Sequence, residues 1–415
     1  MKRFFSILFV VSMFCLISCH RDKDDEPEEG TIEYHGQVLK VMEPVKYDSN
    51  GDGKIDENDA TIEILGTNLN TSCNADGSPL YSGEGSSSGE GIPADGGVVL
   101  GEKLCYHDLE KYCKQNGGFY AFETSVNGSR SSIAESNVES SDANHNGIAD
   151  FIEDIRSTQS ILSIASKFAD EYKSETENKI EKASEHQIST SFVKETIENA
   201  IIQALEEALY ESNESIDISS VETIVTTRVA TAIVACVKEA DLSQYMTSSD
   251  ITAIAIEMAG KVATSVTNSI SSTVSKSVIA QYEAQVASGA VKNVQGICPN
   301  GYHIPSDVEW MIFESALGMS ATDLTKAGET EITRGADAGV AKKMVDEFGF
   351  NYGGYASING TYAQLGEAGV YWSSTTGKDN KGDYVWVRQI DTSYSGVVRF
   401  KMYEKSGLST RCFKD

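Results

Sequence analysis

The chain has 415 residues, of which 62 are acidic and 34 are basic, so its formal net charge is −28 at pH 7. A nucleic-acid binder must meet the phosphate backbone with clustered lysine and arginine, so this acidic surplus excludes a general nucleic-acid-binding role. With 40% hydrophobic and 23% charged residues, the chain has the composition of a globular protein with one to three cores.

Residues 1–18 are predicted to be an export signal. A basic Lys-Arg pair precedes an almost wholly apolar run from Phe4 to Ile17, which is too short to remain as a membrane-spanning helix. The run ends in Leu16-Ile17-Ser18-Cys19, which resembles the lipobox of bacterial lipoproteins. The resemblance implies that Cys19 is acylated, becomes the new N-terminus and anchors the protein to a membrane. A plain signal peptide cut nearby is the alternative.

Residues 19–33 are expected to form an acidic tether. The segment 20–30 has no apolar side chain to bury, so it stays solvated. Acidic residues directly after a lipidated cysteine resemble the signal that sends lipoproteins to the cell surface in Bacteroidetes-type envelopes. We therefore expect a lipid-anchored protein at the outer membrane or cell surface, with a plain spacer as the alternative reading of the tether.

Two segments have the offsets of calcium-binding loops. Residues 48–59, within an N-terminal segment 34–59, place oxygen-bearing side chains at loop positions 1, 3, 5, 9 and 12, a glycine at 6 and a main-chain carbonyl at 7. Residues 142–153 repeat this pattern with a glutamate at position 12. The candidate Ca²⁺ ligands are Asp48, Asn50, Asp52, Lys54, Asp56 and Asp59, and Asp142, Asn144, Asn146, Ile148, Asp150 and Glu153.

These two loops depart from a regulatory EF-hand pair. The first runs into the strand-like segment 61–65, and the second opens into a helix near Phe151. We interpret them as structural calcium clips at domain junctions, with Asx-rich turns that need no metal as the alternative.

Six cysteines remain after Cys15 and Cys19, an even number that permits disulfides in an oxidising location. Cys105 and Cys113 bracket a short loop and could close it. Cys298 and Cys412 would tie the start of the C-terminal region to the chain end. Cys236 lies on an apolar helical stretch, where a buried free thiol is expected, and the state of Cys73 stays open.

Residues 134–291 are predicted to form an all-α helical bundle. Between Asp150 and Ser288 there is no proline and a single glycine. Ser219 and Glu222 have the spacing of a capping box, which predicts a helix that continues through Val237. A continuous coiled coil is the alternative, but the heptads are not sustained. Apolar residues fall on single helical faces in three sets: Phe151, Ile155, Leu162, Ala165, Ala169 and Tyr172; Ile197, Ile201, Leu205 and Ala208; Ile254, Met258, Val262 and Val266.

Residues 60–133 and 292–415 together resemble one known domain. The stretch Gly296-Ile297-Cys298-Pro299-Asn300-Gly301-Tyr302-His303-Ile304-Pro305-Ser306-Asp307-Val308-Glu309-Trp310 resembles the signature G-x-C-P-x-G-W-H-x-P-S-x-x-E-W of the FISUMP ("Fibrobacter succinogenes major paralogous") domain. Tyr302 replaces the usual tryptophan. Further matches, in the order of the family, are Asn68-Leu69-Asn70, the loop 105–113, the segment 117–122, Phe348-Gly349-Phe350, Gly353-Gly354-Tyr355, the segment 371–375 and the segment 407–412.

The resemblance implies an α+β fold, in which a C-type-lectin-like FISUMP domain is interrupted by the helical bundle as an insertion. The lectin calcium signatures Glu-Pro-Asn and Trp-Asn-Asp are absent, so mannose-type calcium-dependent binding does not carry over. Trp310, Trp372 and Trp386 could stack on sugar rings or anchor a protein partner, or they could be core residues.

We therefore expect a non-catalytic extracellular binding or adhesion module with a glycan or protein ligand. His303 is expected to fix a turn rather than abstract a proton, and the sequence has no nucleophile elbow, phosphate loop or zinc-binding helix. Two alternatives stay open: an assembly protein that oligomerises through the helical insertion, and a glycan-processing enzyme.

Overall fold

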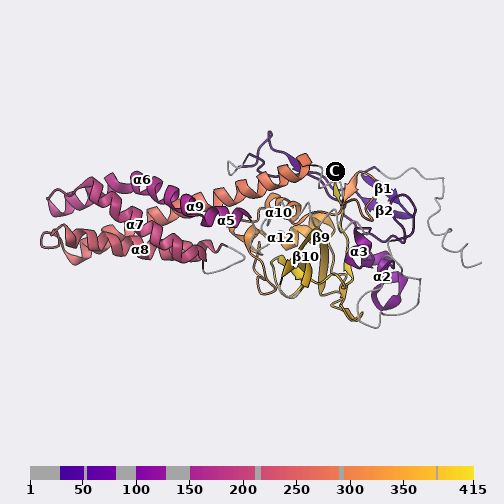
Figure 1. Ribbon diagram of the computed structural model, residues 1–415. Helices are drawn as coiled ribbons and strands as arrows, with labels where there is room; N and C mark the ends of the chain where they lie inside the picture. Colours follow the sequence, from indigo (N-terminus) through magenta and orange to yellow (C-terminus); the bar gives the residue numbers. More distant parts are fainter. Residues whose placement is uncertain are drawn as a thin grey trace, which may run out of the picture. The chain divides into compact units, whose positions relative to one another are not determined.

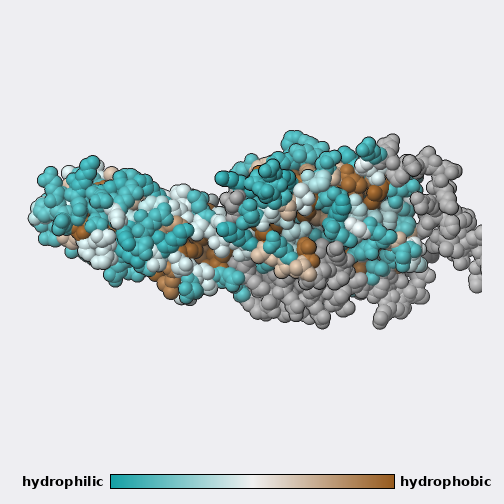
Figure 2. All heavy atoms as spheres, turned by 90° about the horizontal axis from the view of Figure 1, so that it is seen from above, coloured by the Kyte–Doolittle hydropathy of each residue, from teal (hydrophilic) through white to brown (hydrophobic). Residues whose placement is uncertain are grey.

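The computed structural model describes residues 29–50, 54–80, 100–127, 150–210, 216–288, 294–379 and 382–415. Contacts within the chain divide it into two compact units (Figure 1). The helical unit comprises residues 148–277, and the α+β unit comprises residues 1–147 together with 278–415. The protein therefore has the predicted α+β composition. Figure 2 shows one face of the molecule, on which hydrophilic residues cover most of the surface and apolar residues form small patches.

The helical unit is a set of helices packed side by side. α6 packs against α7, and α7 packs against α8. α6 is joined to α9 by a hydrogen bond of 2.8 Å between Tyr172 and Ser265 and by an ion pair of 2.9 Å between Lys179 and Glu257. The helices in the described residues of this region are α5 (Asp150–Arg156), α6 (Thr158–Ser184), α7 (Thr190–Tyr210), α8 (Ile218–Glu239) and α9 (Ser248–Ser288), whose last turns belong to the α+β unit.

The buried faces of these helices match the predicted spacing except at the start of α6. Leu162 was predicted on the buried face but is 42% exposed, and Ile161 is buried in its place. Phe168 explains the difference, because the buried stripe runs through Ile161, Ala165 and Phe168, and Leu162 lies about 100° away around the helix. Other predicted residues are fully buried, namely Ile197, Ile201, Leu205, Met258, Val262 and Val266.

α8 begins earlier than the predicted capping box. Its N-cap is Asp217, whose carboxylate accepts the backbone N–H of Ser219 at 3.0 Å and the hydroxyl of Ser220 at 2.8 Å. Ser219 is therefore inside the first turn. A carboxylate interacts more favourably than a hydroxyl with the positive end of the helix dipole, which explains why the aspartate takes this position.

The α+β unit is built on a five-stranded sheet with the order β11-β10-β9-β12-β5. Neighbouring strands are antiparallel except β12 and β9, which are parallel. β5 precedes the helical region in the sequence, whereas the other four strands follow it, so the two sequence segments form one sheet. The strands are β5 (Phe119–Tyr120), β9 (Ala368–Asp379), β10 (Gly382–Asp391), β11 (Val398–Met402) and β12 (Leu408–Ser409).

In its described residues, the α+β unit also contains four two-stranded antiparallel pairs and several short helices. The pairs are β1 (Thr31–Tyr34) with β2 (Gln37–Lys40), β3 (Val45–Lys46) with β4 (Thr61–Ile62), β6 (Tyr302–His303) with β13 (Phe413–Lys414), and β7 (Tyr355–Ala356) with β8 (Tyr362–Ala363). The helices are η1 (Tyr106–Asp108), α2 (Glu110–Asn116), α3 (Phe122–Ser125), α10 (Asp307–Ala316), α11 (Ala321–Thr325) and α12 (Val340–Phe348).

Two of the three tryptophans lie in the core of the α+β unit. Trp310 and Trp372 are each 0% exposed, whereas Trp386 is half-buried. The indole N–H of Trp372 donates to the carbonyl of Tyr120 at 2.9 Å, and that of Trp310 donates to the carbonyl of Trp372 at 3.3 Å. The indole nitrogens are thus satisfied inside the core, and these two rings are not available to a ligand.

Candidate functional site

The histidine of the sequence signature is completely buried and holds two chain segments together. One ring nitrogen of His303 lies 2.7 Å from Oε1 of Glu309, and the other lies 3.0 Å from Oδ1 of Asp415 at the chain end. Burial alone would lower the pKa of His303, but the charges of Glu309 and Asp415 outweigh it and raise the pKa to about 9. Ser306 and Glu309 also form a capping box at the start of α10. These residues stabilise the fold.

A buried network of ion pairs fixes α10 against the sheet. Arg388 on β10 donates to Asp307 at 2.6 Å and to Glu314 at 2.7 Å. Asp307 forms a second ion pair with Arg399 on β11 at 2.6 Å. Glu314 forms a second ion pair with Arg334, also at 2.6 Å. Burial alone would raise the pKa of Asp307, but the two arginines hold it well below its usual range. The ionised network defines how helix and sheet pack.

Arg411, in the last signature segment, binds main-chain carbonyls instead of carboxylates. Its guanidinium donates to the carbonyl of Leu65 at 2.7 Å, of Phe348 at 3.2 Å and of Gly349 at 2.7 Å. It also lies 4.1 Å from the ring centroid of Phe350. The side chain therefore caps the C-terminal end of α12. The polar side chains of these signature segments therefore make their contacts inside the α+β unit.

The loop closed by Cys105 and Cys113 places several exposed residues on the surface of the α+β unit. The two cysteines are disulfide-bonded with their Cα atoms 5.1 Å apart. Between them, His107 and Asp108 both have left-handed backbone conformations, with φ of 51° and 56°. Two consecutive left-handed residues other than glycine cost about 1–3 kcal/mol each. Such local strain is typical of segments whose shape matters for function.

Four rings gather around this loop, and we call Tyr106, His107, Tyr112 and Tyr362 the aromatic face. The centroid of Tyr106 lies 4.7 Å from that of His107, 5.8 Å from that of Tyr112 and 5.3 Å from that of Tyr362. His107 is exposed and the three tyrosines are half-buried. Tyr362 comes from β8, so a distant hairpin contributes to the same surface.

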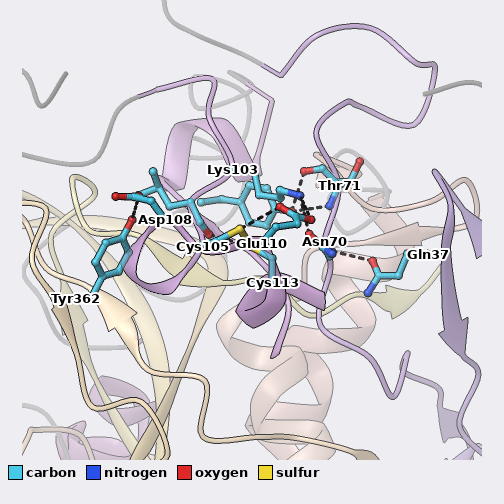
Figure 3. Close-up of a disulfide and its surroundings, with 11 residues drawn as sticks. Gln37, Asn70, Thr71, Lys103, Cys105, Asp108, Glu110, Cys113 and Tyr362 are labelled. Carbon is cyan, nitrogen blue, oxygen red and sulfur yellow. Dashed lines mark hydrogen bonds and ion pairs between the residues drawn. A yellow bond between two sulfur atoms is a disulfide. The ribbon is translucent and has the colours of Figure 1, made fainter. Parts of the chain in front are cut away.

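Hydrogen bonds hold this loop from several sides (Figure 3). The hydroxyl of Tyr362 donates to Asp108 at 2.6 Å. Burial and this hydrogen bond raise the pKa of Tyr362, so it stays a donor. The ammonium group of Lys103 forms an ion pair with Glu110 at 3.1 Å and donates a hydrogen bond to Oδ1 of Asn70 at 2.8 Å. The loop is therefore preorganised, with the carboxylates of Asp108 and Glu110 at the surface.

Sequence reasoning singled out the 105–113 loop as a disulfide candidate but did not identify the aromatic face. Tyr362 is far away in the sequence and lies in no recognised motif. The signal that was available is local: three aromatic or histidine rings and three acidic residues fall within residues 102–114.

The first predicted calcium loop is the connection between β3 and β4. Asp59 is 7% exposed, and its carboxylate accepts the backbone N–H of Ser49 at 3.0 Å and of Asp56 at 2.8 Å. These hydrogen bonds lower the pKa of Asp59. The residue at loop position 12 thus ties the two ends of the loop together. Asp48, Asn50 and Lys54 lie in the same connection, and Asp52 lies outside the described residues.

Most of the second predicted loop also lies outside the described residues, as do Asp142, Asn144, Asn146 and Ile148. Asp150 and Glu153 are in α5, whose first residue is Asp150. This is the direct entry into a helix that the sequence predicts. Calcium binding at both loops stays a prediction. Residues 1–18 and Cys19 lie outside the described residues too.

The other cysteines have defined states. Cys298 and Cys412 are disulfide-bonded, with their Cα atoms 5.9 Å apart and a sequence separation of 114. Cys236 is free and buried on α8, as its apolar surroundings in the sequence predict, and burial raises the pKa of its thiol.

Comparison with known families supports the predicted domain. Residues 238–414 match the Fibrobacter succinogenes major domain, so the chain carries this domain. The match begins at Lys238, inside the helical region, and does not include the predicted first part 60–133. That part joins the domain in the structure through β5. No curated protein and no solved structure matches the chain.

Proposed function

We propose that the protein is a cell-surface lipoprotein whose α+β unit is a non-catalytic binding or adhesion module. The ligand class that fits its surface is an uncharged carbohydrate. The observation that carries the proposal is the aromatic face, a partly exposed group of rings at a strained and cross-linked loop. In this proposal the unit is C-type-lectin-like, and the helical unit is an insertion into it.

The side chains around the aromatic face have the chemistry that sugars require. Half-buried tyrosine rings offer apolar area for the faces of sugar rings at low entropic cost, and their hydroxyls remain polar. The exposed carboxylates of Asp108 and Glu110 accept hydrogen bonds from hydroxyl groups. Together they resemble the mixed apolar and polar lining that ligand sites need.

Charge balance favours an uncharged ligand. The chain as a whole carries a net charge of −28, but residues 102–114 contain three acidic and three lysine residues. The loop is therefore locally neutral on an acidic protein. A neutral ligand can approach it without the repulsion that an anionic ligand would meet.

Preorganisation supports binding rather than a structural role alone. The disulfide, the Tyr362–Asp108 hydrogen bond and the Lys103–Glu110 pair restrain the loop before a ligand arrives. A restrained site loses less conformational entropy on binding. A loop with no function would not need two strained residues, since glycine at His107 or Asp108 would remove the strain.

The N-terminal segment supports the proposed location of the protein at the cell surface. Lipid attached to Cys19 would hold the protein at the membrane, and the acidic tether after it would direct export to the outer surface. Globomycin treatment of producing cells is the test, because an inhibitor of lipoprotein signal cleavage should cause the uncleaved chain to accumulate. A Cys19→Ala variant that is processed and anchored normally would contradict this assignment.

Calcium at residues 48–59 and 142–153 would act as a clip and not as a switch. Ca²⁺ prefers the oxygen ligands that both segments supply, and binding to the folded state alone raises stability by mass action. Calorimetry at millimolar calcium, with and without EDTA, is expected to show a higher melting temperature with calcium. An unchanged melting temperature would contradict the calcium-clip proposal and would not affect the binding proposal.

A glycan array tests the ligand class. The full chain with Cys19→Ser should bind uncharged glycans. Tyr112→Ala should weaken binding at least about fivefold, because one stacking ring is worth about 1–3 kcal/mol. Tyr403→Ala is the matched control, since Tyr403 is 41% exposed in the same unit but outside the aromatic face. His107→Gly should weaken binding without lowering stability, because it removes a ring and relieves the strain together.

The array and its controls also decide between the alternatives. Equal effects of Tyr112→Ala and Tyr403→Ala would contradict the aromatic face as the site. Release of sugar from a bound polysaccharide would favour the glycan-processing enzyme over the binding module.

A further inference from the structure

α8 has an apolar composition, and much of its length is only partly buried in the helical unit. In the part of the chain that the structure describes, α8 is the one helix long and apolar enough by composition to cross a membrane. Only 33% of its most apolar stretch is buried. The buried side, which includes Val221, Val225, Val229 and Ile233, accounts for the packing against the other helices. Other apolar residues of α8, such as Ile224, Ala232 and Val234, are half-buried, and its exposed positions are mainly threonine and charged residues.

The exposed side of α8 forms one wall of an open groove between α7 and α8, with a volume of 410 Å³. Thr223, Thr227, Thr231 and Ala235 follow one another along the groove at intervals of four residues. All four are exposed. Residues at this spacing lie in line on a helix, and small side chains let another helix approach closely.

The threonines do not present free hydroxyl donors to this groove. The hydroxyl of Thr223 donates to the carbonyl of Ser219 at 2.9 Å, that of Thr227 to Thr223 at 2.8 Å and that of Thr231 to Thr227 at 2.8 Å. With the hydroxyls turned to the helix backbone, the methyl groups remain for contact with a partner. The wall is thus apolar although its residues are nominally polar.

The groove is also neutral on an acidic unit. The helical unit contains 21 acidic and 10 basic residues. The groove is lined by one of each, Glu207 and Arg228, which pair with each other at 2.9 Å. Two copies of such an acidic unit repel each other over most of their surfaces, but they do not repel here. A strongly basic partner would be drawn to the acidic surfaces instead.

We propose that the α7–α8 groove is the interface of a two-fold symmetric homodimer. In such an isologous contact the same neutral, small-residue surface of each copy covers the other. Glu207 and Arg228 of each copy then meet an opposite charge on the second copy as well as on their own, so the contact is self-complementary. This inference is independent of the ligand proposed above, and it gives the assembly alternative a defined surface.

Sedimentation of the full chain with Cys19→Ser over a range of concentrations tests the proposal. A dimer is expected. Thr227→Glu should raise the dissociation constant at least about 100-fold, because it buries two like charges near the two-fold axis. Thr264→Glu is the matched control, since Thr264 is an exposed threonine on α9 whose hydroxyl donates to Gly260 in the same way, at 3.0 Å.

Cross-linking supplies a second measurement. Thr227→Cys should form a disulfide-linked dimer on oxidation, and Thr264→Cys should not. A wild-type chain that is monomeric at about 100 μM, where even weak specific dimers form, would overturn the proposal. So would equal effects of the two glutamate variants while circular dichroism shows both folded. Flotation of a monomeric wild type with neutral phosphatidylcholine vesicles, abolished by Thr227→Glu, would assign the groove to a lipid surface instead.

Discussion

At the scale of single residues, His303 links stability to pH. Its pKa of about 9 in the folded protein lies above its ordinary value of 6.5. A raised pKa stabilises the folded state below the unfolded pKa, and the contribution is lost as the pH rises through about 9. The shift corresponds to about 3 kcal/mol. We therefore expect the α+β unit to become less stable between about pH 6.5 and 9.

Tryptophan fluorescence during urea unfolding at pH 6 and at pH 9.5 checks this prediction, because all three tryptophans lie in the α+β unit. His303→Gln should be less stable at pH 6 and should show a much smaller pH dependence. A variant that loses as much stability as the wild type between the two pH values would show that another group is responsible.

Arg411 illustrates a buried charge without a carboxylate partner. Burial lowers its pKa to about 10, so it remains charged at neutral pH. Arg411→Lys keeps the charge but cannot reach the carbonyls of Leu65, Phe348 and Gly349 together. We expect a loss of about 3 kcal/mol in urea unfolding followed by fluorescence. The exposed Lys405→Arg should change stability by less than about 0.5 kcal/mol, and a similar loss in both would contradict the role of Arg411.

At the scale of elements, the start of α8 distinguishes two candidate caps. The carboxylate of Asp217 accepts the backbone N–H of Ser219, whereas the Ser219 side chain lies inside the first turn. Asp217→Ala should destabilise the helical unit by about 1 kcal/mol, and Ser219→Ala should have little effect. Thermal unfolding followed by circular dichroism at 222 nm measures both. A larger effect of Ser219→Ala would restore the capping box that the sequence predicts.

At the scale of the whole molecule, the two described disulfides close loops of very different length. The sequence separations are 114 residues for Cys298–Cys412 and 8 residues for Cys105–Cys113. Loop entropy predicts losses of about 5 kcal/mol and roughly 2.5 kcal/mol when each pair is replaced by alanine. Cys298 and Cys412 also belong to the buried core, so replacing them by alanine should cost further stability through lost packing. Urea unfolding by fluorescence should rank the variants in this order, and the reverse order would show that the short loop is the main constraint.

The sequence by itself determined the elements of this protein whose causes are local. Missing proline and glycine predicted the helices of residues 150–288, and the signature around His303 predicted the domain that the family comparison supports. It favoured Leu162 over Ile161 by helical spacing and Ser219 over Asp217 by the capping-box pattern, and the structure has Ile161 and Asp217 in those roles. Packing and cap geometry separate them.

Only the tertiary structure decided which side chains form the aromatic face. Tyr362 joins the 105–113 loop from 254 residues away, measured from Asp108, and no local pattern records such a contact. The signature residues His303, Asp307 and Arg411 are buried as ion pairs and helix caps. A sequence motif indicates which residues the fold requires. The side chains that stay exposed are decided only once that fold has formed.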